Sequence, residues 1–191
     1  RIPSQAGLGG GSSDCAAALK GLNELWGLSL GEERLREIGL RLGADVPFCL
    51  TGGLCRARGL GEVLTPLPSR RRHLLLVKPA QGLSTPEVFH AFDRLGSPDA
   101  GDIEAAARAL ALGDDELLAR SARNMLTDAA ISLCPEVRET LLALRELGAS
   151  FCAMSGSGSA CLALFPEDRF PEKEDLCRFP SFCLPTYTTA G

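Results

Sequence analysis

A cluster of glycines directly in front of a helix-forming run is the feature that most limits how this chain folds. Four glycines fall within residues 7–11, and Ser12, Ser13 and Asp14 follow them. Glycine has no Cβ, so its backbone N–H groups can approach a ligand closely. The first N–H groups of a helix lack internal partners, and the helix dipole adds partial positive charge there. The stretch therefore predicts a phosphate-binding helix start, and the alternative is a plain turn with a serine cap.

Two widespread phosphate-binding loops do not fit this stretch. A Walker A loop requires Gly-Lys-Ser/Thr after the glycines, and the chain has Gly11-Ser12-Ser13 instead. The dinucleotide-binding fingerprint requires a strand before the glycines and a βαβ context, which the surrounding sequence does not supply. We expect the two serine hydroxyls to cap the helix, to contact phosphate or to help hold a metal ion.

Length and charge restrict the classes of protein. The chain has 191 residues, enough for one domain or two small ones with a buried core. Its net charge of −4 gives no general reason to expect binding to nucleic acid or to an anionic membrane. We identify neither a signal peptide nor an apolar stretch of transmembrane length, and these patterns favour a cytoplasmic protein.

Cysteine usage leads to the same expectation. The chain has eight cysteines, without a Cys-x-x-Cys pair, and its histidines are His73 and His90. Zinc sites and disulfide frameworks have more regular spacings. Most of the cysteines stand inside apolar runs, so we expect reduced thiols that pack as small hydrophobic side chains.

Periodicity and turn residues predict the order of the elements. Gly52-Gly53 is predicted to be a hairpin turn. Pro47 is predicted to end any helix and to precede a strand. Ser29-x-x-Glu32 is typical of a capping box at a helix start, and Pro86 of a first helical turn. Helices are expected over 13–26, 29–42, 84 onward, 102–112, 114–122, 124–133, 135–147 and 167–177. Strands are expected over 54–58, 73–79, 160–165 and 182–188, with a strand-rich segment over 59–68 and one more strand before the loop at 155–159.

The glycine stretch resembles the ATP-binding motif of the GHMP kinase superfamily. The resemblance lies in Pro3 and in Ala6-Gly7-Leu8-Gly9-Gly10-Gly11-Ser12-Ser13. The motif Gly-Leu-Gly-Gly-Gly-Ser-Ser-Asp, which ends at Asp14, is most similar to the branch of the superfamily whose substrate is diphosphocytidyl methylerythritol. It implies ATP as co-substrate with Mg²⁺, and ATP contacts from Pro3, Ser4, Gln5, Ala6, Gly7, Leu8, Gly9, Gly10, Gly11, Ser12 and Ser13.

The resemblance also implies an α+β fold of two domains. An incomplete N-terminal ATP-binding α/β domain is expected over residues 1–69. A ferredoxin-like C-terminal substrate domain is expected over residues 70–191, with a four-stranded antiparallel sheet and helices on one face. Pro66, Pro68 and the basic run 70–72 mark the boundary.

Asp45 is the candidate catalytic residue. A lone aspartate after a glycine is more often a turn or cap residue. This one precedes Val46-Pro47-Phe48, so we expect it among apolar neighbours, where a carboxylate must be paired or its pKa rises. A kinase needs a group that accepts or orients the substrate's hydroxyl proton. The block from Gly43 to Phe48 resembles the one that carries the family's catalytic aspartate.

Two further segments resemble substrate-side parts of the family. Thr85-Pro86-x-x-Phe89 implies a hydrogen bond from Thr85 and stacking of Phe89 on a cytosine ring. The alternative is that Phe89 belongs to the core of an amphipathic helix. The loop Met154-Ser155-Gly156-Ser157-Gly158-Ser159 resembles the third motif of the family and implies that Gly156, Ser157 and Gly158 line the site.

The family also uses a lysine near its N-terminus, and neither Lys20 nor Lys78 matches that motif. We therefore expect the chain to be a fragment that lacks an N-terminal segment. The leading hypothesis is ATP-dependent phosphorylation of the 2-hydroxyl of diphosphocytidyl methylerythritol. We expect neither a nucleic-acid nor a membrane partner. The alternatives are a mevalonate- or homoserine-type kinase, or a nucleotide-binding fragment without activity. The oligomeric state stays open.

Overall fold

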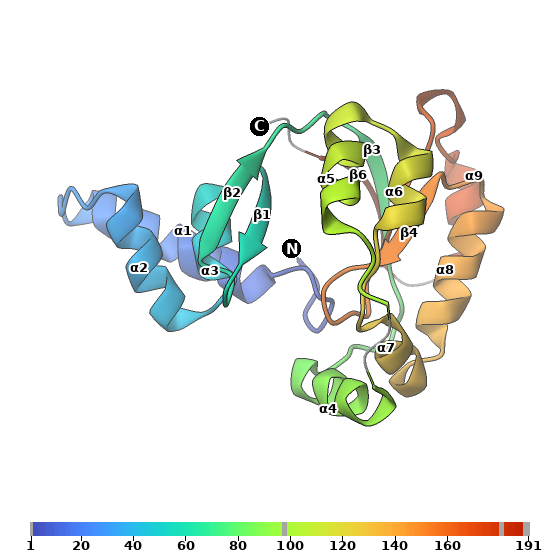
Figure 1. Ribbon diagram of the computed structural model, residues 1–191, viewed down its shortest axis with the longest axis horizontal. Coiled ribbons are helices and arrows are strands. Elements are labelled where there is room, and N and C mark those ends of the chain that lie inside the picture. Colours follow the sequence, from blue (N-terminus) through green and yellow to red (C-terminus); the bar gives the residue numbers. More distant parts are fainter. Residues whose placement is uncertain (1, 97–98, 180–181, 189–191) are drawn as a thin grey trace. The chain divides into compact units, whose positions relative to one another are not determined.

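The computed structural model describes residues 2–96, 99–179 and 182–188. The chain forms two compact units (Figure 1). The helical unit comprises residues 9–69, and the sheet unit comprises residues 2–8 together with the described residues from 70 onward. The units divide the chain differently from the predicted domains in one respect, because residues 2–8 pack with the sheet unit. The glycine motif therefore continues from one unit into the other.

The helical unit packs its helices around a small apolar core. Its buried residues are Ala16, Leu35, Val46 and Leu50. Lys20 of the first helix is tied to the third, since its Nζ donates to the Leu50 carbonyl oxygen at 2.8 Å. The elements are α1 (Gly10–Leu25), α2 (Glu32–Leu42), α3 (Val46–Thr51) and the antiparallel pair β1 (Leu54–Arg58) and β2 (Val63–Leu67).

Three local predictions for this unit are wrong. The second helix begins at Glu32 with Gly31 as its N-cap, and Ser29 has a positive φ of 53°, so no capping box forms there. Pro47 lies in the first turn of α3 and not before a strand, because the first turn needs no N–H from proline. Gly52 ends α3, and the hairpin turn lies instead between β1 and β2.

The sheet unit contains the expected four-stranded antiparallel sheet. Its strand order is β4-β5-β3-β6, so β4 and β6 are the edges. The central pairing aligns Leu75 of β3 with Ala163 of β5. The strands are β3 (His73–Lys78), β4 (Phe151–Met154), β5 (Cys161–Leu164) and β6 (Phe182–Tyr187), and the helices are α4 (Thr85–Leu95), α5 (Ile103–Leu112), α6 (Asp115–Ser121), α7 (Thr127–Leu133), α8 (Glu136–Glu146), η1 (Glu167–Arg169) and α9 (Lys173–Leu176).

Helices cover both faces of this sheet, which corrects the expectation of helices on one face. Residues alternate between the faces along each strand. Leu75 and Ala163 face the larger core, which includes Val137 and Leu144 of α8. On the other face, Leu164 clusters with Ala109 of α5 and Leu118 of α6. Figure 1 shows these two helices lying over the sheet. Helix α5 is short and rich in alanine, so its sequence did not indicate that it covers the second face of the sheet.

A charged pair fastens α6 to the sheet. Arg72 binds both carboxylate oxygens of Asp115, with one Nη2–Oδ2 distance of 2.7 Å, and the Ser150 hydroxyl donates to the same carboxylate. Partial burial alone would raise the pKa of Asp115, but the hydrogen bonds from Arg72 and Ser150 and the Arg72 charge hold that pKa below its ordinary value. Ionised Asp115 is therefore part of the folded state.

The cysteines are unpaired thiols, and most are at least half-buried, as predicted, with Cys177 exposed. Burial, with smaller contributions from Cys152 and Cys134, raises the pKa of Cys161 to about 12, so this thiol stays protonated at neutral pH. Within the described ranges, none of the helices is both long and apolar enough to cross a membrane.

Candidate functional site

The first half of the glycine motif lies against the loop at 155–159 inside the sheet unit. The backbone oxygen of Gln5 accepts from the N–H of Leu83 at 3.2 Å and of Ser159 at 3.4 Å, and Ala6 accepts from Ala160 at 3.1 Å. The Ser155 hydroxyl donates to the Gly7 carbonyl oxygen at 2.9 Å. These contacts bring two segments together that are about 150 residues apart in the sequence. Pro3 and Leu8 are half-buried, and Ser4 is exposed.

Two glycines make this close approach possible. Gly7 has a φ of +70°, and a Cβ on it would stand 2.0 Å from the Ser155 carbonyl oxygen. Gly156 has a φ of +53°, and its Cβ would stand 2.9 Å from the Gly7 carbonyl oxygen. Both the backbone conformation and the space therefore require glycine at these positions. The glycines of the two motifs serve to let one backbone pack directly on the other.

Asn124, on the connection between α6 and α7, holds the same loop from the other side. Its Nδ2 donates to the carbonyl oxygens of Met154 and Gly156, both at 2.8 Å, and its Oδ1 accepts from the N–H of Leu126 at 3.0 Å. We did not predict this residue from the sequence. The available signal was the asparagine itself, whose side-chain oxygen can accept from the backbone N–H two residues on in an Asx turn, but the sequence analysis placed it inside a helix.

The buried Ser159 adds a second support that the sequence analysis missed. Its side chain is fully buried, and its Oγ donates to the Gln81 carbonyl oxygen at 2.6 Å. The loop is thus attached to the segment that leads into α4. Gly158 also has a positive φ, +85°, and a Cβ on it would meet the side chains of Met154 and Leu83.

The predicted substrate residues Thr85 and Ser157 lie together. Their hydroxyl oxygens are 2.8 Å apart, which joins the start of α4 to the loop at 155–159. Phe89 follows Thr85 by one helical turn, so both lie on the same side of α4. Phe89 is 50% exposed, whereas Val88 and Ala91 fill the core. The alternative assignment of Phe89 to the core is therefore excluded, and its ring is accessible.

The second half of the glycine motif opens α1 in the helical unit. Gly9 is the N-cap, with a left-handed backbone and without a side-chain cap. The first bond of the helix ladder runs from the N–H of Ser13 to the Gly9 carbonyl oxygen at 2.9 Å. The N–H groups of Gly10, Gly11 and Ser12 thus precede the ladder, as an anion-binding helix start requires. Ser12 and Ser13 lie inside the first turn and are not the cap.

Asp45 is the N-cap of α3, in the same unit as Ser12 and Ser13. Its side chain is exposed, although Val46 and Pro47 after it are buried. The expectation that apolar neighbours enclose Asp45 is therefore wrong, because the helix turns the two apolar side chains inward and leaves the cap outside. Burial, and then the nearby Asp45 charge, raise the pKa of the Cys49 thiol one turn later.

The described residues do not provide a ready-made metal centre. Among them, no three His, Cys, Asp or Glu side chains gather in a way that could hold an ion. Mg²⁺ in phosphoryl-transfer sites commonly takes most of its ligands from nucleotide phosphates and water. The serine hydroxyls in the first turn of α1 are oxygen donors of the kind that Mg²⁺ takes as ligands.

Two protein families and several curated relatives match the sequence of this chain. The family described as GHMP kinases N terminal domain matches residues 1–53, and GHMP kinases C terminal matches residues 104–178. The 4-diphosphocytidyl-2-C-methyl-D-erythritol kinase of Nocardia farcinica is 47% identical over 168 residues, 85% of this chain and 55% of the relative. The kinase of the same name from Paramagnetospirillum magneticum is 46% identical over 170 residues, 88% of this chain and 59% of the relative. The chain thus spans little more than half the length of these curated relatives.

Solved structures show the same likeness. A crystal structure of 4-(cytidine 5'-diphospho)-2C-methyl-D-erythritol kinase superposes with a TM-score of 0.79 at 35% identity, over all of this chain and 69% of that chain. Homoserine kinase from Cytophaga hutchinsonii has a TM-score of 0.75 at 20% identity, over all of this chain and 68% of its own, and shows a shared fold alone. With both domain families matched in order and a 35% identical structure covered over more than two thirds, this chain belongs to the GHMP kinase family.

Proposed function

We propose that this chain is the greater part of a kinase that transfers the γ-phosphoryl group of ATP to the 2-hydroxyl of 4-diphosphocytidyl-2-C-methyl-D-erythritol. The observation that carries the proposal is the packing of Gly7 against the loop at 155–159, whose Ser157 is joined to Thr85. Residues of the predicted nucleotide motif and of the predicted substrate segment are thereby linked within one unit. The relatives named for this reaction support the choice of substrate.

In this proposal the helix start of α1 receives the ATP phosphates. The N–H groups of Gly10, Gly11 and Ser12 and the dipole of a 16-residue helix favour negative charge there. Residues 3–9 and 13 complete the proposed nucleotide contacts. Mg²⁺ bound to the phosphates would offset the charge that develops on the transferred group.

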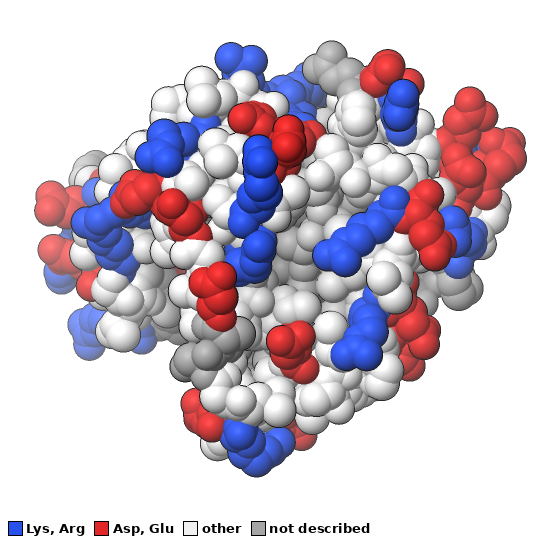
Figure 2. All heavy atoms as spheres, turned by 45° about the vertical axis from the view of Figure 1, so that its right-hand side comes forward, with Lys and Arg blue, Asp and Glu red and all other residues white. Residues whose placement is uncertain are grey.

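Asp45 would orient the attacking hydroxyl of the substrate and accept its proton. Its exposed position at the helix end leaves the carboxyl group accessible to a substrate, and a carboxyl group is a common general base. On the substrate side, the accessible ring of Phe89 would stack on cytosine, and Thr85, with Gly156, Ser157 and Gly158, would line the site. We propose a cytoplasmic location and a small-molecule partner, without nucleic acid or membrane; basic and acidic side chains are interspersed over the face in Figure 2.

The test is a coupled ATPase assay of the complete gene product that contains this chain. We expect turnover with 4-diphosphocytidyl-2-C-methyl-D-erythritol and none above background with homoserine or mevalonate. Asp45→Asn should lower kcat by about 10²–10⁴-fold with little change in ATP affinity, since asparagine keeps the shape and loses the charge. Turnover with homoserine or mevalonate instead would favour a different kinase of the family. A variant whose melting temperature falls while kcat is kept would make Asp45 a cap residue only.

A further inference from the structure

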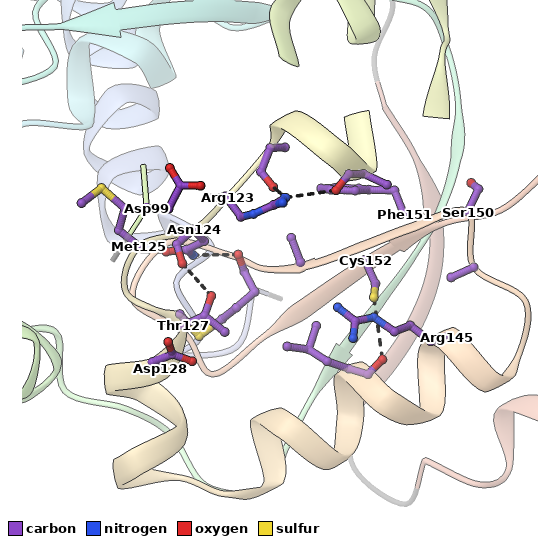
Figure 3. A pocket seen from close by; sticks show the side chains of 16 residues that line it. Asp99, Arg123, Asn124, Met125, Thr127, Asp128, Arg145, Ser150, Phe151 and Cys152 are labelled. Carbon is purple, nitrogen blue, oxygen red and sulfur yellow. Dashed lines mark hydrogen bonds between the residues drawn. The ribbon is translucent and has the colours of Figure 1, made fainter. Parts of the chain in front are cut away.

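A cavity lies at the open edge of the sheet, on residues that the proposed function does not use for ATP or substrate. Its volume is about 410 Å³, within the range of small-molecule sites. Edge strand β4 forms its floor, and residues from the end of α6, the start of α7 and one side of α8 form its walls (Figure 3). All of these elements belong to the sheet unit, so the cavity is formed within one compact body.

The floor offers hydrogen-bonding groups of the main chain. The carbonyl oxygen of Met154 accepts a hydrogen bond from Asn124 Nδ2. Because Asn124 lies outside the sheet, this oxygen points away from β5. Main-chain groups alternate between the two sides of a strand, so Cys152, two residues earlier, also directs its N–H and C=O to the open side. An edge strand of this kind presents donors and acceptors that a ligand can use.

Two arginines stand on either side of this floor. Arg123 is held in position, because its Nη1 donates to the carbonyl oxygens of Ala119 at 3.0 Å and Ala122 at 2.8 Å. Arg145 extends from the last turn of α8. Figure 3 shows the two arginines on opposite sides of the strand that carries Cys152, with Cys152 beside Arg145. Among the described residues, neither arginine forms an ion pair with a carboxylate.

The end of the cavity away from Arg145 is acidic and polar. Asp99, Thr127 and Asp128 lie there (Figure 3), and Asp99 Oδ1 already accepts from the N–H of Gly101 at 3.0 Å. A ligand that spans the cavity therefore meets Arg145 at one end and oxygen acceptors at the other, with Arg123 between them (Figure 3). Guanidinium groups recognise phosphate and carboxylate, and free oxygen acceptors recognise hydroxyl groups.

We propose that this cavity binds a small hydroxylated anion, with its phosphate or carboxylate between Arg123 and Arg145 and its hydroxyl groups towards Asp99 and Asp128. The fixed Arg123 guanidinium reduces the entropy lost on binding, because one of the two charged partners is ordered in advance. The inference is independent of the kinase reaction, since neither arginine belongs to the proposed ATP or substrate contacts.

Calorimetry of the 191-residue chain with three matched probes tests the site. Glycerol 3-phosphate and glycerate carry the anion, and glycerol carries the hydroxyl groups alone. We expect at least one of the two anions to bind and glycerol not to bind. The anion that binds more tightly shows whether the site prefers phosphate or carboxylate. Arg123→Gln and Arg145→Gln should each weaken binding about tenfold or more. The controls Arg120→Gln, on α6, and Arg138→Gln, on α8, remove the same charge outside the cavity and should leave binding unchanged.

Nuclear magnetic resonance of the wild-type chain gives a measurement that needs no variant. Glycerol 3-phosphate or glycerate should shift the Cys152 amide and the Nε–H signals of Arg123 and Arg145. Binding that leaves these signals in place, and shifts only the amides of residues 10–12, would assign the anion to the start of α1 and overturn the proposal. Absence of binding, or equal binding to the Arg123→Gln and Arg145→Gln variants, would overturn it as well.

Discussion

Replacing Asn124 by alanine should loosen the loop at 155–159. The change removes two donations to carbonyl oxygens and one acceptance from the Leu126 N–H. A net value of about 0.5–1.5 kcal/mol for each bond suggests a loss of about 2–4 kcal/mol. Because water can reach the exposed Gly156 oxygen, we expect the lower end, about 2 kcal/mol.

A loss of this size is measurable as a shift of the thermal transition. For a chain of this length, about 2 kcal/mol lowers Tm by roughly 4–8 °C. Circular dichroism on heating gives Tm, and hydrogen exchange locates the effect. The amides of Gly158 and Ser159, which bond within this region, should exchange faster in Asn124→Ala, while those of β3 and β5 keep their protection.

Two further variants separate the hydrogen bonds from general damage. Asn124→Asp keeps the acceptor for Leu126 but directs a carboxylate at two carbonyl oxygens, so it should be at least as unstable as alanine at neutral pH. That deficit should shrink below a pH of about 4, where the protonated acid can donate. Asn23→Ala removes a similar pair of bonds in the helical unit and should leave the loop's exchange unchanged. Unaltered loop exchange and an unchanged Tm in Asn124→Ala would refute the reasoning.

Three more changes have definite expected results. Gly7→Ala should lower the unfolding free energy of the sheet unit by more than Gly148→Ala does. Gly148 also has a positive φ, but a Cβ on it would meet no atom within 4 Å. Equal melting temperatures of the two variants would contradict the backbone contact of Gly7. Gly10→Val in the complete gene product should weaken ATP binding about tenfold or more by calorimetry, because its Cβ blocks the helix-start N–H groups, and an unchanged affinity would reject the phosphate assignment. Asp115→Asn should destabilise at neutral pH by about 1–3 kcal/mol. Since the folded pKa of Asp115 is depressed, urea titrations should show this difference shrinking as pH falls below about 4, and a constant difference would contradict the ion pair with Arg72.

Elements with strong local signals could be predicted from the sequence. The apolar run at β3 continues into Pro79, α4 has proline in its first turn, and α8 has apolar residues in helical phase followed by Gly148. Each signal acts within a few residues, so it needs no knowledge of the remaining chain. The antiparallel four-stranded sheet followed from the order of such elements and from the family resemblance.

Elements that depend on distant contacts were assigned incorrectly. The segment after Asp45 is short, apolar and contains proline, which suits a strand or a first helical turn equally well, and burial of Val46 and Leu50 against Ala16 and Leu35 selects the helix. The exposure of Asp45 follows from that choice. The second helical layer on the sheet likewise depends on where α5 and α6 meet Leu164.

The glycine motif by itself determined that a helix start would present unpaired N–H groups, because glycine content and helix polarity are local properties. Only the tertiary structure decided what the motif's first half contacts. Gly7 lies against a loop that follows it by about 150 residues, and Asn124 supports that loop through two backbone oxygens. Backbone oxygens are the same in every residue, so no pattern of side chains in the sequence could identify them as the partners of Asn124.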